Sequence, residues 1–163
     1  AGAGAGEERL IFLSHQWLAW DEPDPSGLQY RVMVAAAREV ARVNGWAEST
    51  VLVWVDYCCC PQRHARLQDL AIESLPHYAG LAHALVAVVP ATVHRDTGDV
   101  CDAESYQRRM WCRAEQLCYA LRDGSHNLFT ADAASEDTAD AACAGSANAT
   151  DAANGTGAGG DGG

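Results

Sequence analysis

The sequence predicts an α/β protein with a flavodoxin-like three-layer sandwich and a parallel sheet of about four to five strands. Three observations lead to this prediction. Short apolar segments alternate along the chain with segments of helical period, the apolar segments are rich in β-branched residues, and they are apolar on both faces. Strands of that kind form parallel sheets covered by helices on both sides, and right-handed crossovers then give a doubly wound fold.

Four apolar segments are the expected strands, and the first three are closed by a polar residue or a proline. They are residues 9–14 (RLIFLS), 51–56 (VLVWVD), 83–89 (HALVAVV) and the shorter 127–129 (NLF). In this class of fold, ligands bind outside the carboxyl ends of the strands, where the strand order reverses. We therefore expect these polar side chains to gather at that edge: Ser14, His15, Gln16, Asp56 and Gln62.

Three further segments have the period of an amphipathic helix. They are residues 28–43, a stretch from Leu67 to Tyr78, and residues 103–122. For the last of these, Asp102 or Ser105 is the expected N-cap and Asp123-Gly124 the stop. Its predicted core face consists of Met110, Ala114, Leu117 and Leu121.

Composition divides the 163-residue chain into three parts. We expect residues 1–8 to be a flexible lead, 9–130 the folded domain and 131–163 a disordered, acidic, low-complexity tail. Residues 131–163 contain 12 Ala, 7 Gly and 6 acidic residues, with no large apolar or basic residue. Such a segment cannot bury enough apolar surface to offset the entropy lost on ordering.

The charge balance restricts the partners that we expect. The 22 acidic residues outnumber the 11 basic ones, which gives a net charge of −11 and argues against nucleic acid or an anionic membrane as partner. No apolar run reaches the roughly 20 residues that a membrane span needs. Seven cysteines, three of them adjacent, suit reduced thiols better than a disulfide framework. We therefore expect a cytoplasmic protein.

Two common kinds of catalytic site are excluded by the local sequence. No glycine-rich loop follows the first strand, so the dinucleotide-binding and P-loop patterns are both missing. A hydrolase triad of Ser14, His15 and Asp56 is rejected because neighbouring residues on a strand point to opposite faces. Ser14 also lacks the strand-to-helix elbow that exposes a nucleophile.

The most informative segment is YQRRMWCRAEQL, residues 106–117. On a helix Trp111 and Glu115 are four residues apart, so that the ring and the carboxylate lie on one face. Two interpretations of Glu115 remain open at this point. It is either an exposed flanking residue paired with Arg108 or Arg122, or a carboxylate held in a cleft beside an aromatic wall.

Three motifs of the chain resemble a known family. They are Phe12-Leu13-Ser14-His15, Val53-Trp54-Val55-Asp56 and, above all, Trp111-Cys112-x-x-Glu115. Together they resemble the TIR (Toll/interleukin-1 receptor) domain, particularly its plant immune-receptor form. An overlapping resemblance is to the fungal heterokaryon-incompatibility (HET) domain, a distant relative of TIR. That resemblance lies in Val53-Trp54-Val55-Asp56-x-x-x-Cys60-x-Gln62, then Tyr78, then Arg109-x-Trp111-x-x-x-Glu115 with Ala120.

The TIR resemblance implies an intracellular signalling domain of a defence or cell-death pathway that cleaves the nicotinamide–ribose bond of NAD⁺ or a related dinucleotide. Glu115 is then the catalytic residue and Trp111 an apolar wall of the site. Ser14, His15, Gln16 and Asp56 are the implied substrate-binding residues. NAD⁺ is the substrate, so no cofactor and no metal are expected. Self-association with like domains is implied as well.

The chain departs from the plant TIR pattern in three places. His15-Gln16-Trp17 stands where Phe-Arg-Gly usually follows the serine. The loop at 18–27 is acidic and would repel a pyrophosphate unless it points away. The foldable part ends near residue 130, short of the helix, strand and helix with which the family continues.

Two alternatives to the enzyme remain. One is a non-catalytic assembly module of the same fold, which associates through its helices and the loop after the second strand. The other is a metal or redox protein that uses Cys58-Cys59-Cys60 with His64, although adjacent cysteines are poorly placed to bind one tetrahedral ion. The surroundings of Glu115 distinguish the enzyme from the module, and convergence of the sulfur atoms on His64 would indicate the metal site.

Overall fold

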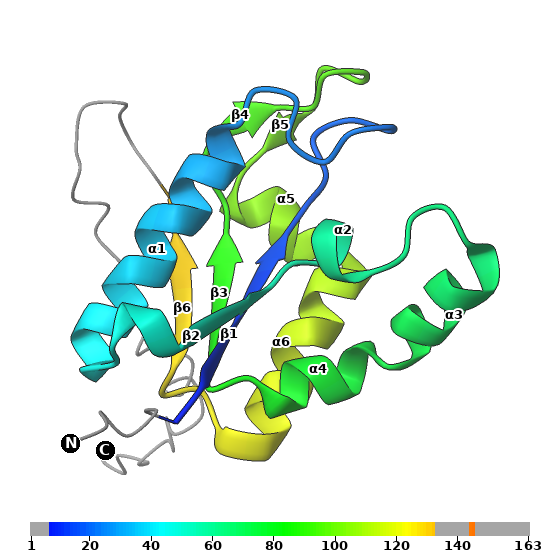
Figure 1. The fold of residues 1–163 in the computed structure, drawn as a ribbon. Helices are drawn as coiled ribbons and strands as arrows, with labels where there is room; N and C mark the ends of the chain where they lie inside the picture. Colours follow the sequence, from blue (N-terminus) through cyan, green and yellow to red (C-terminus); the bar gives the residue numbers. More distant parts are fainter. Residues whose placement is uncertain (1–6, 133–143, 146–163) are drawn as a thin grey trace, which may run out of the picture.

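The computed structural model describes residues 7–132 and 144–145. Its centre is a five-stranded sheet of order β2-β1-β3-β6-β7 (Figure 1). The strands are β1 (Arg9–His15), β2 (Val51–Trp54), β3 (Ala84–Val88), β6 (Leu128–Ala131) and β7 (Ala144–Gly145). The first four are parallel, and β7 pairs with β6 in the antiparallel direction. The predicted α/β, flavodoxin-like class is thus confirmed.

Strand β1 lies between β2 and β3. After β1 the chain forms β2 on one flank of β1, and then crosses to the opposite flank to form β3. Ser14 and His15, the last residues of β1, pair with Ala87 and Val88 of β3. The strand order therefore reverses at the carboxyl end of β1, which is the place where ligands bind in such sheets.

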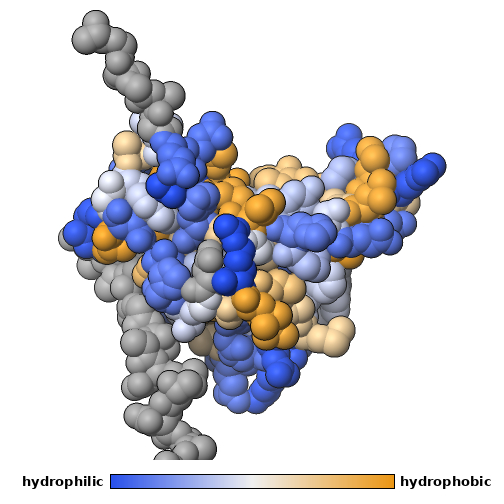
Figure 2. All heavy atoms as spheres, turned by 90° about the horizontal axis from the view of Figure 1, so that it is seen from below, coloured by the Kyte–Doolittle hydropathy of each residue, from blue (hydrophilic) through white to orange (hydrophobic). Residues whose placement is uncertain are grey.

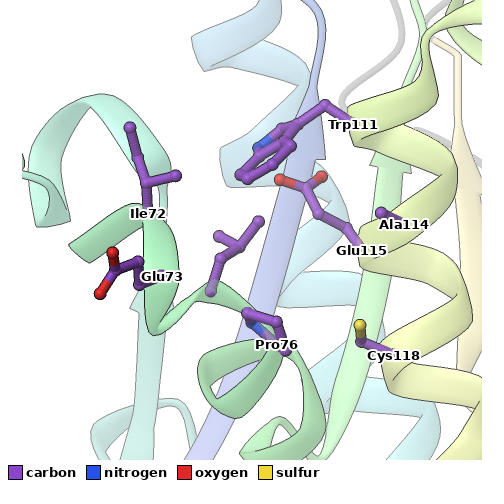
Figure 3. A pocket seen from close by; sticks show the side chains of 8 residues that line it. Ile72, Glu73, Pro76, Trp111, Ala114, Glu115 and Cys118 are labelled. Atoms are coloured by element: carbon purple, nitrogen blue, oxygen red, sulfur yellow. The ribbon is translucent and has the colours of Figure 1, made fainter. Parts of the chain in front are cut away.

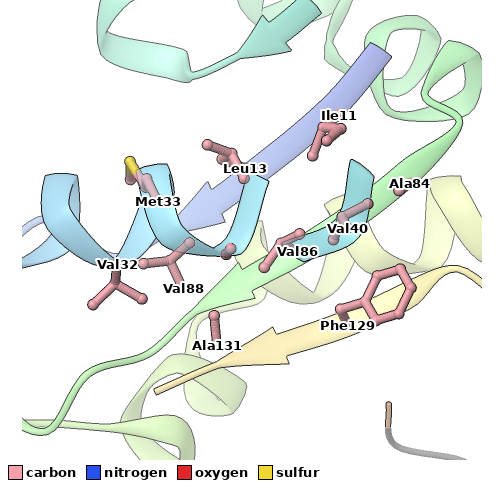
Figure 4. Packing of buried hydrophobic residues seen from close by; sticks show 11 residues of the cluster. Ile11, Leu13, Val32, Met33, Val40, Ala84, Val86, Val88, Phe129 and Ala131 are labelled. Carbon is pink, nitrogen blue, oxygen red and sulfur yellow. The ribbon is translucent and has the colours of Figure 1, made fainter. Parts of the chain in front are cut away.

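Helices cover both faces of the sheet, as Figure 1 shows. One face is covered by α1 (Leu28–Asn44), and the other by α4 (Leu75–Leu81) and α6 (Met110–Asp123). The core under α1 is built mainly of aliphatic side chains from the helix and three strands (Figure 4). Its largest members are Ile11, Leu13, Val32, Met33, Val40, Val86, Val88 and Phe129.

The core on the second face is more aromatic. It contains Phe12, Trp54, Leu75, Leu85 and Tyr119, and the rings of Phe12 and Trp54 stack with their centroids 4.3 Å apart. Side chains of β1 enter the two cores alternately because successive residues of a strand point to opposite faces. Ser14 is therefore on the same face of the sheet as Phe12 and α6.

The remaining elements are short, apart from α3. They are η1 (Glu48–Thr50), α2 (Asp56–Cys59), α3 (Ala65–Glu73), β4 (Thr92–Val93), β5 (Val100–Cys101) and α5 (Ala103–Arg108). Strands β4 and β5 form a separate antiparallel pair. Within the described residues, no helix combines the length and the apolar character that a membrane span requires.

The helix predicted over residues 103–122 is two helices in the structure. Asp102 and Ser105 form a capping box at the start of α5, and the extended backbone of Arg109 separates α5 from α6. Both residues named as candidate N-caps therefore take part in the cap, and Gly124 ends α6 as predicted.

The predicted core face of that helix is wrong. Met110, Leu117 and Leu121 are 80%, 58% and 77% exposed, and the buried side chains of α6 are Cys112, Glu115 and Tyr119. The segment is helical, as its period predicts, but the more apolar of its stripes faces outward and a less apolar stripe is buried. The stripe that is buried contains a carboxylate, which is tolerated there because it has a hydrogen-bond partner on β1.

The stretch from Leu67 to Tyr78 also divides, between α3 and α4. Leu75 and Ala79 of α4 pack against the sheet, whereas no residue of α3 is buried. Helix α3 extends away from the sheet (Figure 1), so Leu67 and Leu70 are 47% and 50% exposed and are not the core residues that the pattern predicted.

The predicted flexible lead and disordered tail fall mainly on residues 1–6, 133–143 and 146–163, which lie outside the described part of the chain. Within the predicted tail, the structure describes Ala131, which is the buried last residue of β6, Asp132, and β7, which pairs with β6. The prediction of disorder is therefore wrong for Ala131 and β7.

Candidate functional site

Glu115 is a buried carboxylate that faces β1. It is 4% exposed, and its Oε2 accepts a hydrogen bond from the hydroxyl of Ser14. Arg108 pairs instead with Glu104 on its own helix, and Arg122 donates to the main-chain carbonyl of Gly80. Glu115 is therefore not the exposed flanking residue that one interpretation of the sequence described.

A pocket of about 260 Å³ opens beside this carboxylate, between α6 and the junction of α3 with α4. Its lining residues are Ile72, Glu73, Leu75, Pro76, Trp111, Ala114, Glu115 and Cys118. Figure 3 shows the ring of Trp111 next to the carboxylate of Glu115 on the α6 wall, and the carboxylate of Glu73 directed away from them. The pocket is thus an apolar recess with one carboxylate held against an aromatic ring.

Burial sets the acidity of Glu115. Desolvation raises the pKa of this carboxyl to about 7, the Ser14 hydrogen bond lowers it in part, and the charge of Asp56 adds to the increase. Both protonation states are therefore populated near neutral pH. Carboxyl groups with such a raised pKa in a pocket are typical of functional sites.

Tyr106 is a third member of this site and was not selected from the sequence. It lies on α5, is fully buried, and its hydroxyl is 2.6 Å from that of Ser14. Burial raises the pKa of Tyr106 above its ordinary value, so the phenol keeps its proton. In sequence, Tyr106 stands at the start of the motif-bearing segment, but its partner is 92 residues away, and no local pattern indicates that pairing.

His15 and Asp56 form a separate pair on the other side of β1. His15 Nε2 is 3.6 Å from Asp56 Oδ1, and Asp56 Oδ2 accepts a hydrogen bond of 3.0 Å from the indole nitrogen of Trp17. Burial lowers the pKa of His15, and the charge of Asp56 offsets this in part. Ser14 contacts Glu115 and His15 contacts Asp56, so the arrangement is two pairs and not a triad.

Gln16 and Gln62 have structural contacts away from the pocket. The Gln16 amide donates to Ser105 Oγ at 2.9 Å and to the Asp102 carbonyl at 3.4 Å, and so holds the start of α5. The Gln62 amide donates to the Cys60 carbonyl at 3.0 Å within its own loop. Of the predicted site residues, Trp111 and Glu115 line the pocket, and Ser14 contacts Glu115 without lining it. His15 and Asp56 form the second pair.

The three adjacent cysteines do not converge on His64. Cys58 and Cys59 are exposed, Cys60 is half-buried, and the imidazole of His64 accepts a hydrogen bond from the main-chain nitrogen of Leu67. Among residues 7–132 and 144–145, no group of three or more His, Cys, Asp or Glu side chains is arranged to hold a metal ion.

The acidic loop at 18–27 is held by its own contacts. Asp21 and Glu22 pair with Arg95, which follows β4, and Asp24 accepts a hydrogen bond of 2.8 Å from the main-chain nitrogen of Tyr30 at the start of α1. These carboxylates are therefore directed at Arg95 and at α1, not at the pocket beside α6.

Comparison with protein-family models, with curated proteins and with solved structures found no match to this chain. The resemblance to the TIR and HET domains therefore stays a prediction that rests on the three motifs and on the geometry in which they meet.

Proposed function

We propose that this chain is a TIR/HET-like intracellular signalling domain of a defence or cell-death pathway, and that it cleaves the nicotinamide–ribose bond of NAD⁺ or a related dinucleotide. One observation carries the proposal. Glu115 and Trp111 of the third motif lie side by side in a pocket. The hydroxyl of Ser14, in the first motif, donates a hydrogen bond to Glu115.

The chemistry of this bond suits a site with one carboxylate. Nicotinamide leaves as a neutral molecule from a cationic pyridinium, so no general acid has to protonate it. In ordinary glycoside hydrolysis the leaving oxygen must be protonated, and a second carboxyl group supplies that proton. Glu115 in its ionised form stabilises the positive charge that develops on the ribose and accepts a hydrogen bond from a ribose hydroxyl.

The other lining residues have complementary roles in this proposal. The exposed part of the Trp111 ring provides a flat surface for the pyridinium cation. Leu75, Pro76 and Ala114 form an apolar wall against the nicotinamide and ribose. A water molecule attacks the anomeric carbon while nicotinamide leaves with the electron pair of the C–N bond, so that the products are neutral nicotinamide, the hydroxylated ribose nucleotide and one proton. His15, Gln16 and Asp56, which contact other parts of the fold, contribute by holding the carboxyl end of β1 and the start of α5 in place.

The size of the pocket indicates how much of the substrate it takes. Its volume of about 260 Å³ lies just below the range of roughly 300–1,000 Å³ that is usual for small-molecule sites. The pocket thus accepts the nicotinamide and ribose, and the rest of the dinucleotide lies outside it. A second copy of the domain is the proposed partner that covers this outer part.

The experiment is a nicotinamide-release assay on protein clustered on a scaffold, with Glu115→Gln as the test variant. Glu73→Gln is the matched control, because Glu73 lines the same pocket with its carboxylate turned away. We expect the test variant to lose activity by about 100-fold or more and the control to keep it. No release from folded, clustered protein, or equal release from the test variant, would refute the proposal.

A second candidate function is the non-catalytic assembly module. It is favoured by large apolar side chains at the surface, which Figure 2 shows as orange regions among hydrophilic ones. On α3 and α6 they are Leu67, Leu70, Ile72, Met110, Leu117 and Leu121. This function predicts association without nicotinamide release and with no effect of Glu115→Gln.

A further inference from the structure

Three buried side chains from three different elements meet beneath α6. Ser14 lies near the end of β1, Tyr106 in α5 and Glu115 in α6. Their exposed fractions are 1%, 0% and 4%. The Ser14 hydroxyl is within hydrogen-bond distance of both partners: it lies 2.6 Å from the Tyr106 hydroxyl and donates to Glu115 Oε2.

The number of available protons gives these hydrogen bonds a direction. A serine hydroxyl has one proton to donate, and an ionised carboxylate can only accept. When Glu115 is ionised, the Ser14 proton therefore lies in the bond to Glu115. Tyr106, which keeps its own proton, must then donate to Ser14.

We propose that Tyr106 and Ser14 are positioning residues for Glu115. Their hydroxyls form a chain of hydrogen bonds from Tyr106 through Ser14 to Oε2, which holds the carboxylate in one orientation and leaves Oε1 as the oxygen available to a ligand in the pocket. The catalytic meaning of this chain rests on the proposed function. The chain itself is a property of the folded protein.

The chain also favours the ionised form of Glu115 against the effect of burial. Each donor that points toward the carboxylate stabilises its charge, and a donor chain polarises its members in the same direction. Protonation of Oε2 would require the chain to reverse. Removal of either hydroxyl therefore makes Glu115 harder to ionise.

Other titratable groups face Glu115, and apart from Tyr106 itself none of them is changed in the test. Asp56 of α2 raises the Glu115 pKa through its charge. Glu115 in turn raises the pKa of Cys60, Cys112 and Tyr106. Glu73 and Cys118 line the same pocket. A change of the Glu115 pKa in a variant that lacks only a hydroxyl can thus be attributed to the hydrogen-bond chain.

The test is an NMR titration of the full chain labelled with ¹³C at the Glu side-chain carboxyl, with the Glu115 signal assigned by its loss in Glu115→Gln. Tyr106→Phe and Ser14→Ala are the test variants. Tyr119→Phe is the control, because it removes a buried phenol hydroxyl that contacts the His83 carbonyl instead of Ser14.

We expect Ser14→Ala to raise the Glu115 pKa by about one unit, a tenfold change in its ionisation constant. Tyr106→Phe raises it by less, since the direct donor remains, and Tyr119→Phe leaves it unchanged. The same Glu115 pKa in Tyr106→Phe as in the unsubstituted chain would overturn the proposal. If Ser14→Ala does not fold, Tyr106→Phe still decides, because phenylalanine fills the same ring volume.

The nicotinamide-release assay separates this proposal from the proposed function. A raised Glu115 pKa in Tyr106→Phe, together with no release from any protein, would support the hydrogen-bond chain and refute the proposed enzymatic function. Release that depends on Glu115, together with an unchanged Glu115 pKa in Tyr106→Phe, would support the enzymatic function and refute the role of the hydrogen-bond chain.

Discussion

The properties of Glu115 come from its neighbours more than from its own helix. Burial raises its pKa from 4.5 to about 7, despite the hydrogen bond from Ser14. A shift of this size corresponds to about 3 kcal/mol of free energy between the two protonation states. Ionisation of Glu115, which is about half complete at neutral pH, therefore lowers the stability of the folded protein relative to the unfolded chain.

This cost predicts a pH-dependent difference between the unsubstituted chain and Glu115→Gln. The Glu115 pKa is higher in the folded than in the unfolded state, so the folded state binds the proton more tightly. Its contribution to stability is complete below pH 4.5 and is lost as the pH rises through about 7. Between those values the free energy of unfolding of the unsubstituted chain should fall by about 3 kcal/mol relative to that of the variant.

Urea unfolding of both proteins across this pH range measures the effect, with Glu73→Gln as the control. The two free energies of unfolding have to be compared with each other because the titration of His15 changes the stability of both proteins in the opposite direction. Its pKa is lowered by burial, so its contribution to stability is present above pH 6.5 and is lost as the pH falls through the lowered pKa. Parallel pH profiles for the unsubstituted chain and Glu115→Gln would contradict the prediction.

At the residue scale the sequence indicated the site only in part. Trp111 and Glu115 could be paired because they are four residues apart on a helix. The contacts of Ser14 could not be predicted, since its partners Tyr106 and Glu115 are 92 and 101 residues away along the chain. Only the packing of α5 and α6 on β1 brings these three side chains together.

At the scale of elements, the break between α5 and α6 matters most for the site. Asp102 caps α5, Gln16 ties that cap to the end of β1, and the extended Arg109 lets α6 continue in a new orientation. Tyr106 and Glu115 can therefore both face Ser14 although they belong to different helices. The sequence indicated the cap but not the break, because Arg109 carries no helix-stop signal.

The cap itself can be tested. Asp102→Ala removes the acceptor of the Ser105 main-chain nitrogen and half of the capping box. The expected loss is about 1 kcal/mol in the free energy of unfolding, measured by urea denaturation. Asp99→Ala, at an exposed position three residues earlier, should leave the stability within about 0.5 kcal/mol of the unsubstituted chain. Equal stability of Asp102→Ala and Asp99→Ala would contradict this role.

For the whole molecule, the fold was predictable because three of its four parallel strands are apolar on both faces, which is a strong local signal, whereas the segment that forms β6 gave only a weak one. Strands β4, β5 and β7 were not predicted, since each has only two residues. The orientation of α3 was not predictable either. Its apolar stripe is typical of a core helix, but the sheet beneath is already covered by α4 and α6.

The exposed stripe of α3 leads to a prediction about assembly. If a second copy covers the outer part of the dinucleotide, the nicotinamide-release rate per molecule should rise with protein concentration. The double substitution Leu67→Asp and Leu70→Asp should abolish that rise and weaken self-association, seen by sedimentation. Folding should be preserved because both side chains are about half exposed.

Val43→Asp is the matched control for this experiment, since Val43 is similarly exposed on α1, which covers the opposite face of the sheet. It should retain the concentration dependence. Loss of the dependence in Val43→Asp, or its survival in the double variant, would show that α3 is not the surface through which copies associate.

The pH profile of nicotinamide release by clustered protein tests whether the ionised carboxylate of Glu115 drives cleavage of the nicotinamide–ribose bond. If it does, the rate rises about tenfold per pH unit at low pH and levels off above a midpoint near 7, the Glu115 pKa. Glu115→Gln should show no release along the whole profile. A flat profile, or one shared by Glu115→Gln, would contradict the role of the ionised carboxylate.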